Sequence, residues 1–147
     1  MSRNQIKEPP GPKVVQDNIV YSINIKEQTA VVIGFDQPIF EEEDEVDLFI
    51  PRSINYESKE YIITSIYNRA FKDQLVKSVT FPSDSEVRTI EEAAFCFSTI
   101  EKFTIPPHLT IISNDVFNGC SNLHNLEFPP NCELRTIEYR AFNFVDF

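Results

Sequence analysis

The last two thirds of the chain repeat one short pattern, and this repetition limits the fold more than any other feature. Three apolar-proline pairs recur at intervals of 24 and 23 residues: Phe81-Pro82, Ile105-Pro106 and Phe128-Pro129. Each pair is followed by an apolar residue that stands five positions before a phenylalanine, and this unit has a period of 22–25 residues. A constant step inside such a period is typical of a structural unit that stacks on copies of itself. The repetition therefore predicts a solenoid, which presents an elongated surface and has no built-in catalytic pocket.

Four units can be aligned on this pattern. Each contains a strand that ends in proline, an isoleucine further on, and then a short turn of helix with a small residue before a phenylalanine. Because small and large residues occupy the same places in every copy, we expect the phenylalanines to stack as a spine, each contributing about 1.5–3 kcal/mol on burial. A polar insertion at residues 55–60 lengthens the first unit. The helical turns are Ala70-Phe71, Ala94-Phe95, Val116-Phe117 and Ala141-Phe142.

The residues ahead of the repeats divide into a leader and a cap. Residues 1–13 are polar and rich in proline, which predicts a disordered leader. Within residues 14–46, apolar residues alternate with polar ones from Ile19 to Ile25, and residues 29–34 return as a second strand. This pattern predicts an N-terminal β-hairpin cap. The acidic run at residues 41–45 is either a solvated loop or an acidic docking site.

Composition excludes several classes of partner. The net charge of −10 argues against nucleic acid, which needs a basic face, and against an anionic membrane surface. No stretch approaches the roughly 18 apolar residues of a membrane span. The chain shows no signal peptide, and Asn-x-Ser/Thr is absent despite eleven asparagines. We therefore expect a cytoplasmic protein, with a cell-surface location by a non-classical route as the alternative.

Residues with catalytic or metal-binding chemistry are few and scattered. Cys96, Cys120 and Cys132 form no C-x-x-C pair, which favours reduced structural thiols. His108 and His124 have no Cys or His partner at metal-ligand spacing. Cys120 and His124 are close in sequence, but Cys120 occupies a repeat core position. We therefore expect no enzyme activity, no metal site and no cofactor.

The last copies resemble a known repeat family. They read S-T-I-E-K-F-T-I-P-P-H-L-T-I-I-S-N-D-V-F-N-G-C-S-N-L and H-N-L-E-F-P-P-N-C-E-L-R-T-I-E-Y-R-A-F, similar to the BspA-like (treponemal-type) leucine-rich repeats of bacterial surface proteins, a family expanded in trichomonad parasites. The family's pattern has a cysteine three residues after its phenylalanine; Cys120 provides it once, and Ser98 and Val145 replace it elsewhere. The residues in register are Ile100, Phe103, Ile105, Pro106, Leu109, Ile112, Phe117, Cys120 and Leu123.

The resemblance implies a fold and a function. The fold class is an α/β-type repeat: a short leucine-rich-repeat solenoid with parallel strands on one face, an N-terminal β-hairpin cap, and four repeat units in residues 47–147. The implied function is a non-catalytic protein-protein interaction scaffold, with adhesion as one role; the alternative is a structural or non-functional family remnant. The expected partner-binding positions are those that alternate with inward apolar residues along the strands. They are Asp47, Phe49, Lys77, Ser78, Thr80, Glu101, Lys102, Thr104, His124, Asn125 and Glu127.

The C-terminal end is apolar where a solenoid normally carries a polar capping unit. Phe142, Phe144 and Phe147 would lie near this open end. The tail either folds back to cap the stack or leaves a face for a weak end-to-end homodimer.

Overall fold

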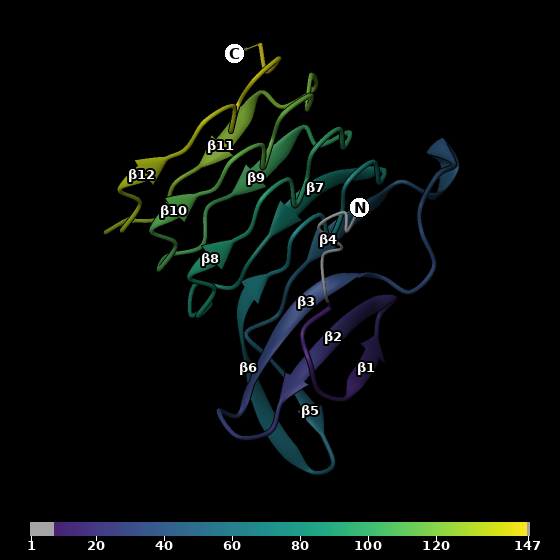
Figure 1. The fold of residues 1–147 in the computed structure, drawn as a ribbon. Helices are drawn as coiled ribbons and strands as arrows, with labels where there is room; N and C mark the ends of the chain where they lie inside the picture. Colours follow the sequence, from purple (N-terminus) through teal and green to yellow (C-terminus); the bar gives the residue numbers. More distant parts are fainter. Residues whose placement is uncertain (1–7, 147) are drawn as a thin grey trace, which may run out of the picture.

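The chain winds into stacked coils around one apolar core, closed at one end by β-hairpins (Figure 1). The structure is a computed structural model and describes residues 8–146. Residues 1–7 of the predicted leader (residues 1–13) and the terminal Phe147 lie outside the described residues. The elements are β1 (Lys13–Gln16), β2 (Ile19–Asn24), β3 (Thr29–Phe35), a 3-10 turn η1 (Glu42–Asp44), β4 (Val46–Phe49), β5 (Ser53–Tyr56), β6 (Lys59–Ile66), β7 (Val76–Thr80), β8 (Thr89–Ile90), β9 (Lys102–Thr104), β10 (Ile111–Ile112), β11 (Asn125–Glu127) and β12 (Thr136–Ile137).

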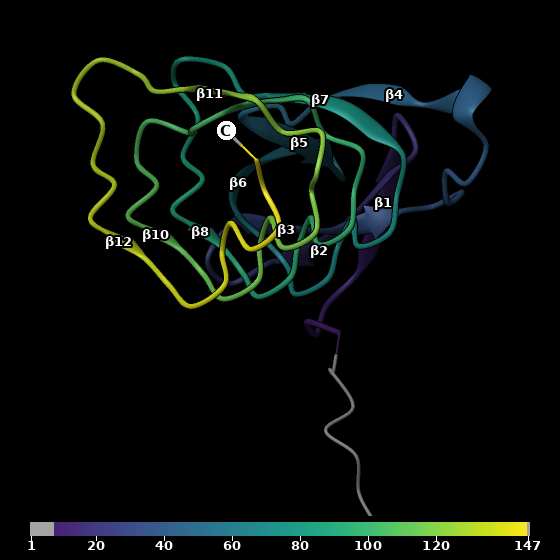
Figure 2. The ribbon, with the colours of Figure 1, turned by 90° about the horizontal axis from the view of Figure 1, so that it is seen from above.

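Two sheets line the core. The short sheet has four parallel strands in the order β11-β9-β7-β4. The long sheet has eight strands in the order β1-β2-β3-β6-β8-β10-β12, with β5 on β6. The short sheet is the parallel ladder that the repeats predict. Each coil also adds a second parallel strand to the long sheet, on another side of the stack (Figure 2). The repeated isoleucines form this second ladder, because Ile66, Ile90, Ile112 and Ile137 are in register.

The predicted hairpin cap is present and continues the long sheet. β2 and β3 are antiparallel, and β3 pairs in parallel with β6, so the hairpin covers the first coil. The segment before β2 is ordered further back than we expected: the Ile23 amide donates to the Pro12 carbonyl at 2.9 Å, and the Ser22 hydroxyl to the Pro9 carbonyl at 3.2 Å. The described part of the predicted leader therefore lies against β2.

The polar insertion of the first unit is a second β-hairpin. β5 and β6 pair through the turn Glu57-Ser58, whose residues have φ of 47° and 64°. Two successive residues with positive φ are the geometry of a tight hairpin turn that matches strand twist. The sequence does not predict this hairpin, because its strands are polar. Their register is set by the pairing of β6 in the long sheet.

The phenylalanine spine is confirmed. Phe71, Phe95, Phe117 and Phe142 stack in order, with successive ring centroids 5.3, 6.0 and 5.3 Å apart. Phe103 of the short sheet packs edge-on against two of these rings, with centroids 5.4 Å from Phe95 and 4.8 Å from Phe117. Aromatic pairs at these separations contribute about 0.5–1.5 kcal/mol beyond burial.

The expected turns of helix are wrong. The described residues contain no α-helix, and the segment around each spine phenylalanine is a pair of tight turns. The Phe95 amide donates to the Val116 carbonyl of the next coil at 3.1 Å, while the following Cys96 amide closes a turn on the Ala93 carbonyl. Because alternate amides bond the neighbouring coil, they cannot bond four residues back as a helix requires. Each of these turns is flanked by two residues with a positive φ, the left-handed backbone conformation. The pairs are Arg69 and Asp73, Ala93 and Phe97, Asp115 and Gly119, and Arg140 and Phe144.

Candidate protein-binding strand face

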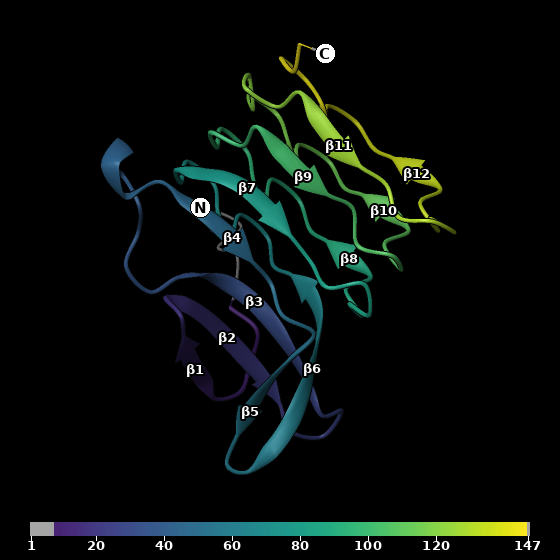
Figure 3. The same cartoon turned by 180° about the vertical axis from the view of Figure 1, so that it is seen from behind.

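The four strands of the short sheet lie side by side (Figure 3). The eleven predicted positions form three rows across its outer side, which we call the strand face. Strand pairing aligns the rows, because each coil adds one strand in parallel register. Along each strand, the outward residues alternate with buried residues such as Val79 and Phe103. The first row is Asp47, Ser78, Lys102 and Asn125; the second is Phe49, Thr80, Thr104 and Glu127; the third, at the start of the strands, is Lys77, Glu101 and His124.

Side chains bridge neighbouring strands both within a row and between the first and second rows. The Ser78 hydroxyl donates to Asp47 Oδ1 at 2.7 Å. Lys102 Nζ lies 2.9 Å from Glu127 Oε1, and the Thr104 hydroxyl lies 3.4 Å from Glu127 Oε2. The hydrogen bond from Lys102 holds the pKa of the Glu127 carboxyl below its ordinary value. Cross-strand contacts of this kind hold the polar side chains in one arrangement over the sheet.

The strand face carries both signs of charge. Two positive residues (Lys77 and Lys102) and three negative ones (Asp47, Glu101 and Glu127) give its eleven positions a net charge of −1, in proportion to the −10 of the whole 147-residue chain. Phe49 adds an exposed apolar ring, 53% accessible. The strand face is therefore a mixed polar surface with one exposed aromatic ring.

The third row forms the edge of the strand face. The Glu101 amide donates to the Lys77 carbonyl at 2.8 Å, and the His124 amide to the Glu101 carbonyl at 3.1 Å. These residues are therefore aligned by the backbone. The His124 ring contacts the Asn122 carbonyl through Nδ1 at 2.8 Å and is exposed.

Two of the three cysteines are buried in the core. All three are free. Cys120 is buried, and its Sγ donates to the Phe95 carbonyl at 3.0 Å. Burial raises the pKa of the Cys120 thiol, and likewise that of Cys96. A nucleophilic thiol needs a lowered pKa, so this environment suits a core residue.

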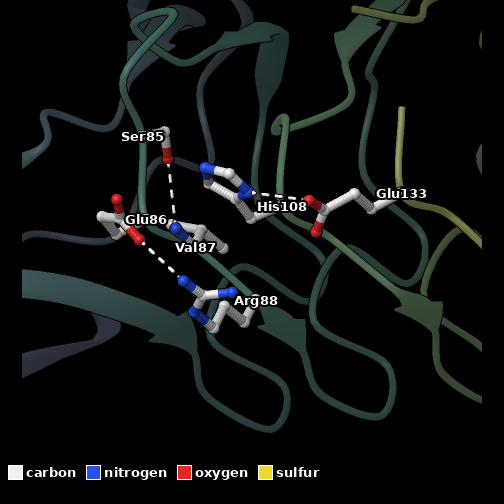
Figure 4. A network of polar contacts seen from close by, with 6 residues as sticks. All are labelled: Ser85, Glu86, Val87, Arg88, His108 and Glu133. Atoms are coloured by element: carbon white, nitrogen blue, oxygen red, sulfur yellow. Dashed lines mark hydrogen bonds and ion pairs between the residues drawn. The ribbon is translucent and has the colours of Figure 1, made fainter. Parts of the chain in front are cut away.

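A group of polar contacts joins the loops between the two sheets (Figure 4). His108 Nδ1 lies 3.3 Å from Glu133 Oε1 of the next coil, and Arg88 lies 3.0 Å from Glu86. The Val87 amide donates to the Ser85 hydroxyl at 3.3 Å. These contacts tie each loop to itself or to its neighbour. Among residues 8–146, no three His, Cys, Asp or Glu side chains gather as metal ligands, and no helix is long and apolar enough to cross a membrane.

Comparison with known proteins agrees with the geometry. The BspA type leucine rich repeat region matches residues 47–146, in six copies. A leucine-rich repeat protein from Bacteroides ovatus is 30% identical with a TM-score of 0.76, over 91% of this chain and 33% of that one. The pneumococcal vaccine antigen PcpA is 22% identical with a TM-score of 0.68, over 92% and 42% of the two chains. A leucine-rich repeat protein from Bacteroides capillosus is 21% identical with a TM-score of 0.50, over 88% and 73%.

This chain thus spans about a third of the first of these structures and less than half of the second. None of the curated proteins matches it.

Proposed function

Because the chain belongs to the family of BspA-type leucine-rich repeats, we propose that it is a non-catalytic scaffold that binds another protein through the strand face. The observation that carries the proposal is the alignment of eleven outward positions in rows across four parallel strands. An aligned, rigid face costs little side-chain and loop ordering on binding. A role in adhesion is the particular form of this function that the family resemblance favours.

The partner is a protein with a mixed or neutral surface. The strand face carries both signs of charge at close spacing, as in the Lys102–Glu127 pair, so it complements a surface that also alternates in sign. The net charge of −10 disfavours nucleic acid.

A variant pair tests the strand face. Lys77→Ala, Lys102→Ala and Glu127→Ala together remove two positive charges and one negative charge from it. The matched control removes the same charges beside the long sheet, with substitutions that are all at exposed positions. They are Arg88→Ala, Arg135→Ala and Glu138→Ala.

Partners captured with the full chain should be purified and titrated by calorimetry. We expect saturable binding that the strand-face variant weakens at least tenfold and the control variant leaves unchanged. Equal binding by both variants would place the partner elsewhere, and the lack of any saturable partner would favour the alternative of a family remnant.

We also propose a weak end-to-end homodimer through the last coil. Ile137 is 56% exposed and Phe144 is 74% exposed, so the residues up to Asp146 leave much of this coil uncovered, although Val145 packs against the core. The variant Ile137→Ser with Phe144→Ser should shift the light-scattering mass toward the monomer at high protein concentration. A monomer for both proteins at every concentration would contradict the dimer.

A further inference from the structure

A cleft of about 450 Å³ lies at the capped end of the molecule, between β4 and the turn that joins β1 to β2. Ile19, Tyr21 and Phe35 of the cap line it from one side, and Leu48 and Phe49 of β4 line it from the other. In Figures 1 and 3, β4 is the last strand of the short sheet and faces the hairpin strands β1 to β3. This cleft is separate from the outward side chains of the strand face, although Asp47 and Phe49 border both.

Among the described residues, the β4 edge that faces away from β7 has no paired strand. The Val46 amide donates to the Leu75 carbonyl at 3.3 Å and the Ile50 amide to the Thr80 carbonyl at 3.1 Å, both on the β7 side. Alternate residues of a parallel strand direct their backbone groups to opposite sides, so those of Asp47 and Phe49 point to the open side. Within the described part of the chain, β4 has only β7 as a neighbour. Such an edge can pair with an added strand.

The opposite wall is held in place before any ligand binds. Asp17 and Asn18 form a tight turn with φ of 51° and 62°. Asn18 Nδ2 donates to the Gln37 carbonyl at 2.9 Å, and the Gln37 amide donates back to Asn18 Oδ1 at 2.7 Å. The Phe35 ring packs on Phe71 of the spine, with centroids 4.8 Å apart. A preformed cleft costs little ordering on binding.

Tyr21 adds a polar group to this apolar cleft. The residue is 1% exposed and contributes to the lining of the cleft. The Asp17 carboxylate, which also lines the cleft, lies close enough to affect the Tyr21 hydroxyl electrostatically. Because Tyr21 lines the cleft, its hydroxyl is a candidate hydrogen-bonding contact for a ligand.

The charged residues that line the cleft, Asp17 and Asp47, are both acidic. Seven acidic residues and no basic residue lie between Asp36 and Asp47, including the exposed η1 turn. Asp17 on the opposite wall adds another negative charge. A cationic segment is therefore attracted to this end, where an anionic one would be repelled.

We propose that this cleft binds an extended basic peptide segment of another protein, which adds to the open edge of β4 as a further strand. Apolar side chains of the segment enter the cleft, and its Lys or Arg side chains point to the acidic residues. β-Strand addition takes its affinity from main-chain hydrogen bonds and its specificity from alternate side chains. The inference goes beyond the proposed function and does not depend on it, because it uses the backbone edge of β4.

The test measures binding of three fluorescein-labelled hexapeptides to the full chain by fluorescence anisotropy. The first alternates lysine and valine, the second is the same peptide N-methylated at every internal amide, and the third has glutamate in place of lysine. We expect saturable binding of the first peptide only, at least tenfold tighter than the other two. The N-methylated peptide keeps the charges and loses the strand donors, so equal binding of the first two would overturn strand addition.

Two variants of one residue locate the binding edge. Phe49→Ala keeps the backbone amide on the open side, and Phe49→Pro removes it without removing a bond to β7, as proline allows on an edge strand. We expect Phe49→Pro to bind the lysine peptide at least tenfold more weakly than Phe49→Ala, and Tyr21→Phe to bind it several-fold more weakly than the unchanged protein. Lys102→Ala on the strand face should bind it normally, which separates this inference from the proposed function.

Circular dichroism melts show whether Phe49→Pro folds. If it does not, binding of the N-methylated peptide to the unchanged protein tests whether the peptide adds as a strand. Binding by Phe49→Pro equal to that by Phe49→Ala would overturn the assignment to β4. The proposal would also be wrong if the chain dimerises through this edge and excludes the peptide, because the occupant would then be a second copy of the chain.

Discussion

The third and the last coils carry the same motif and differ in what covers them. Ile112 and Ile137 are in register in the long sheet, yet Ile112 is 1% exposed and Ile137 is 56% exposed. Phe117 is buried between two rings, and Phe142, at the end of the spine, is half-buried. At the other end, Tyr21, Ala30 and Val32 of the hairpin cap are buried with the first coil. Position in the motif sets where a side chain points, and the neighbouring layer sets how much that side chain stabilises the fold.

Truncation of the spine should show the largest difference between the coils. Phe95→Ala removes a fully buried ring and should lower the free energy of unfolding by about 3–5 kcal/mol. Phe142→Ala should lower it by about 1–2 kcal/mol, because burial of that ring is partial. Urea unfolding of both variants measures the difference. Equal losses would mean that the last coil is covered in solution.

The isoleucine ladder tests the same contrast with a matched pair. Ile112→Ala should cost about 2–5 kcal/mol, since it opens a cavity in the core. Ile137→Ala, at the exposed end of the ladder, should stay within about 0.5 kcal/mol. Thermal unfolding of the two variants under one condition compares them. If Ile137→Ala lowers the stability as much as Ile112→Ala does, the difference in burial between the two coils does not hold in solution.

The covered N-terminal end should respond to alkaline pH. Burial, and then the charge of Asp17, raises the pKa of Tyr21 from 10.0 to about 12. Between these values the unfolded chain loses the proton and the folded chain keeps it, so the free energy of unfolding falls as pH rises; below this window the tyrosine has no effect. Tyr21→Phe should therefore lose less stability than the unchanged protein when pH is raised through the window.

Tyr139→Phe provides the control for this prediction, because Tyr139 lies in the last coil and is exposed. Its stability should follow that of the unchanged protein over the same alkaline range. If Tyr21→Phe also follows it, Tyr21 ionises equally easily in the folded and unfolded states.

Thiol reactivity compares the coils without changing the fold. Cys96 and Cys120 are buried, and burial raises the pKa of both thiols; Cys132 of the last coil is half-buried. A thiol reagent at mildly alkaline pH should label Cys132 in the folded protein and the other two only on unfolding. Mass spectrometry of time points gives the order. Because the cysteines are free, reducing agent should leave the melting temperature unchanged; rapid labelling of Cys120 would contradict its burial.

The smallest effect is expected on the strand face. Lys102→Ala removes the hydrogen bond that lowers the pKa of Glu127, so that pKa should rise toward its ordinary value. Both side chains are exposed, so stability should change little. An NMR titration of the Glu127 carboxyl, with Arg88→Ala as a distant control, checks the shift. An unchanged Glu127 pKa would mean that the pair does not persist in solution.

Much of the fold and of the strand face could be predicted from period and alternation. The spacing of Phe95 and Phe117 predicts their stacking, and the β2–β3 hairpin follows from alternating apolar residues. The turn conformation around Phe95 could not be predicted, because its amide bonds a carbonyl in another coil. The β5–β6 hairpin could not be predicted either, since its polar residues carry no apolar alternation and its register depends on the sheet beside it.

The sequence by itself determined the repeat, the inward and outward positions of each coil, and the residues of the strand face, because stacking imposes the same local geometry on every copy. Only the tertiary structure decided the second parallel ladder, the cleft between β4 and the hairpin cap, and the unequal burial of Ile112 and Ile137. Those features depend on contacts between residues far apart in the chain. A repeated motif specifies its own unit, and the neighbour that covers the unit is set by the whole stack.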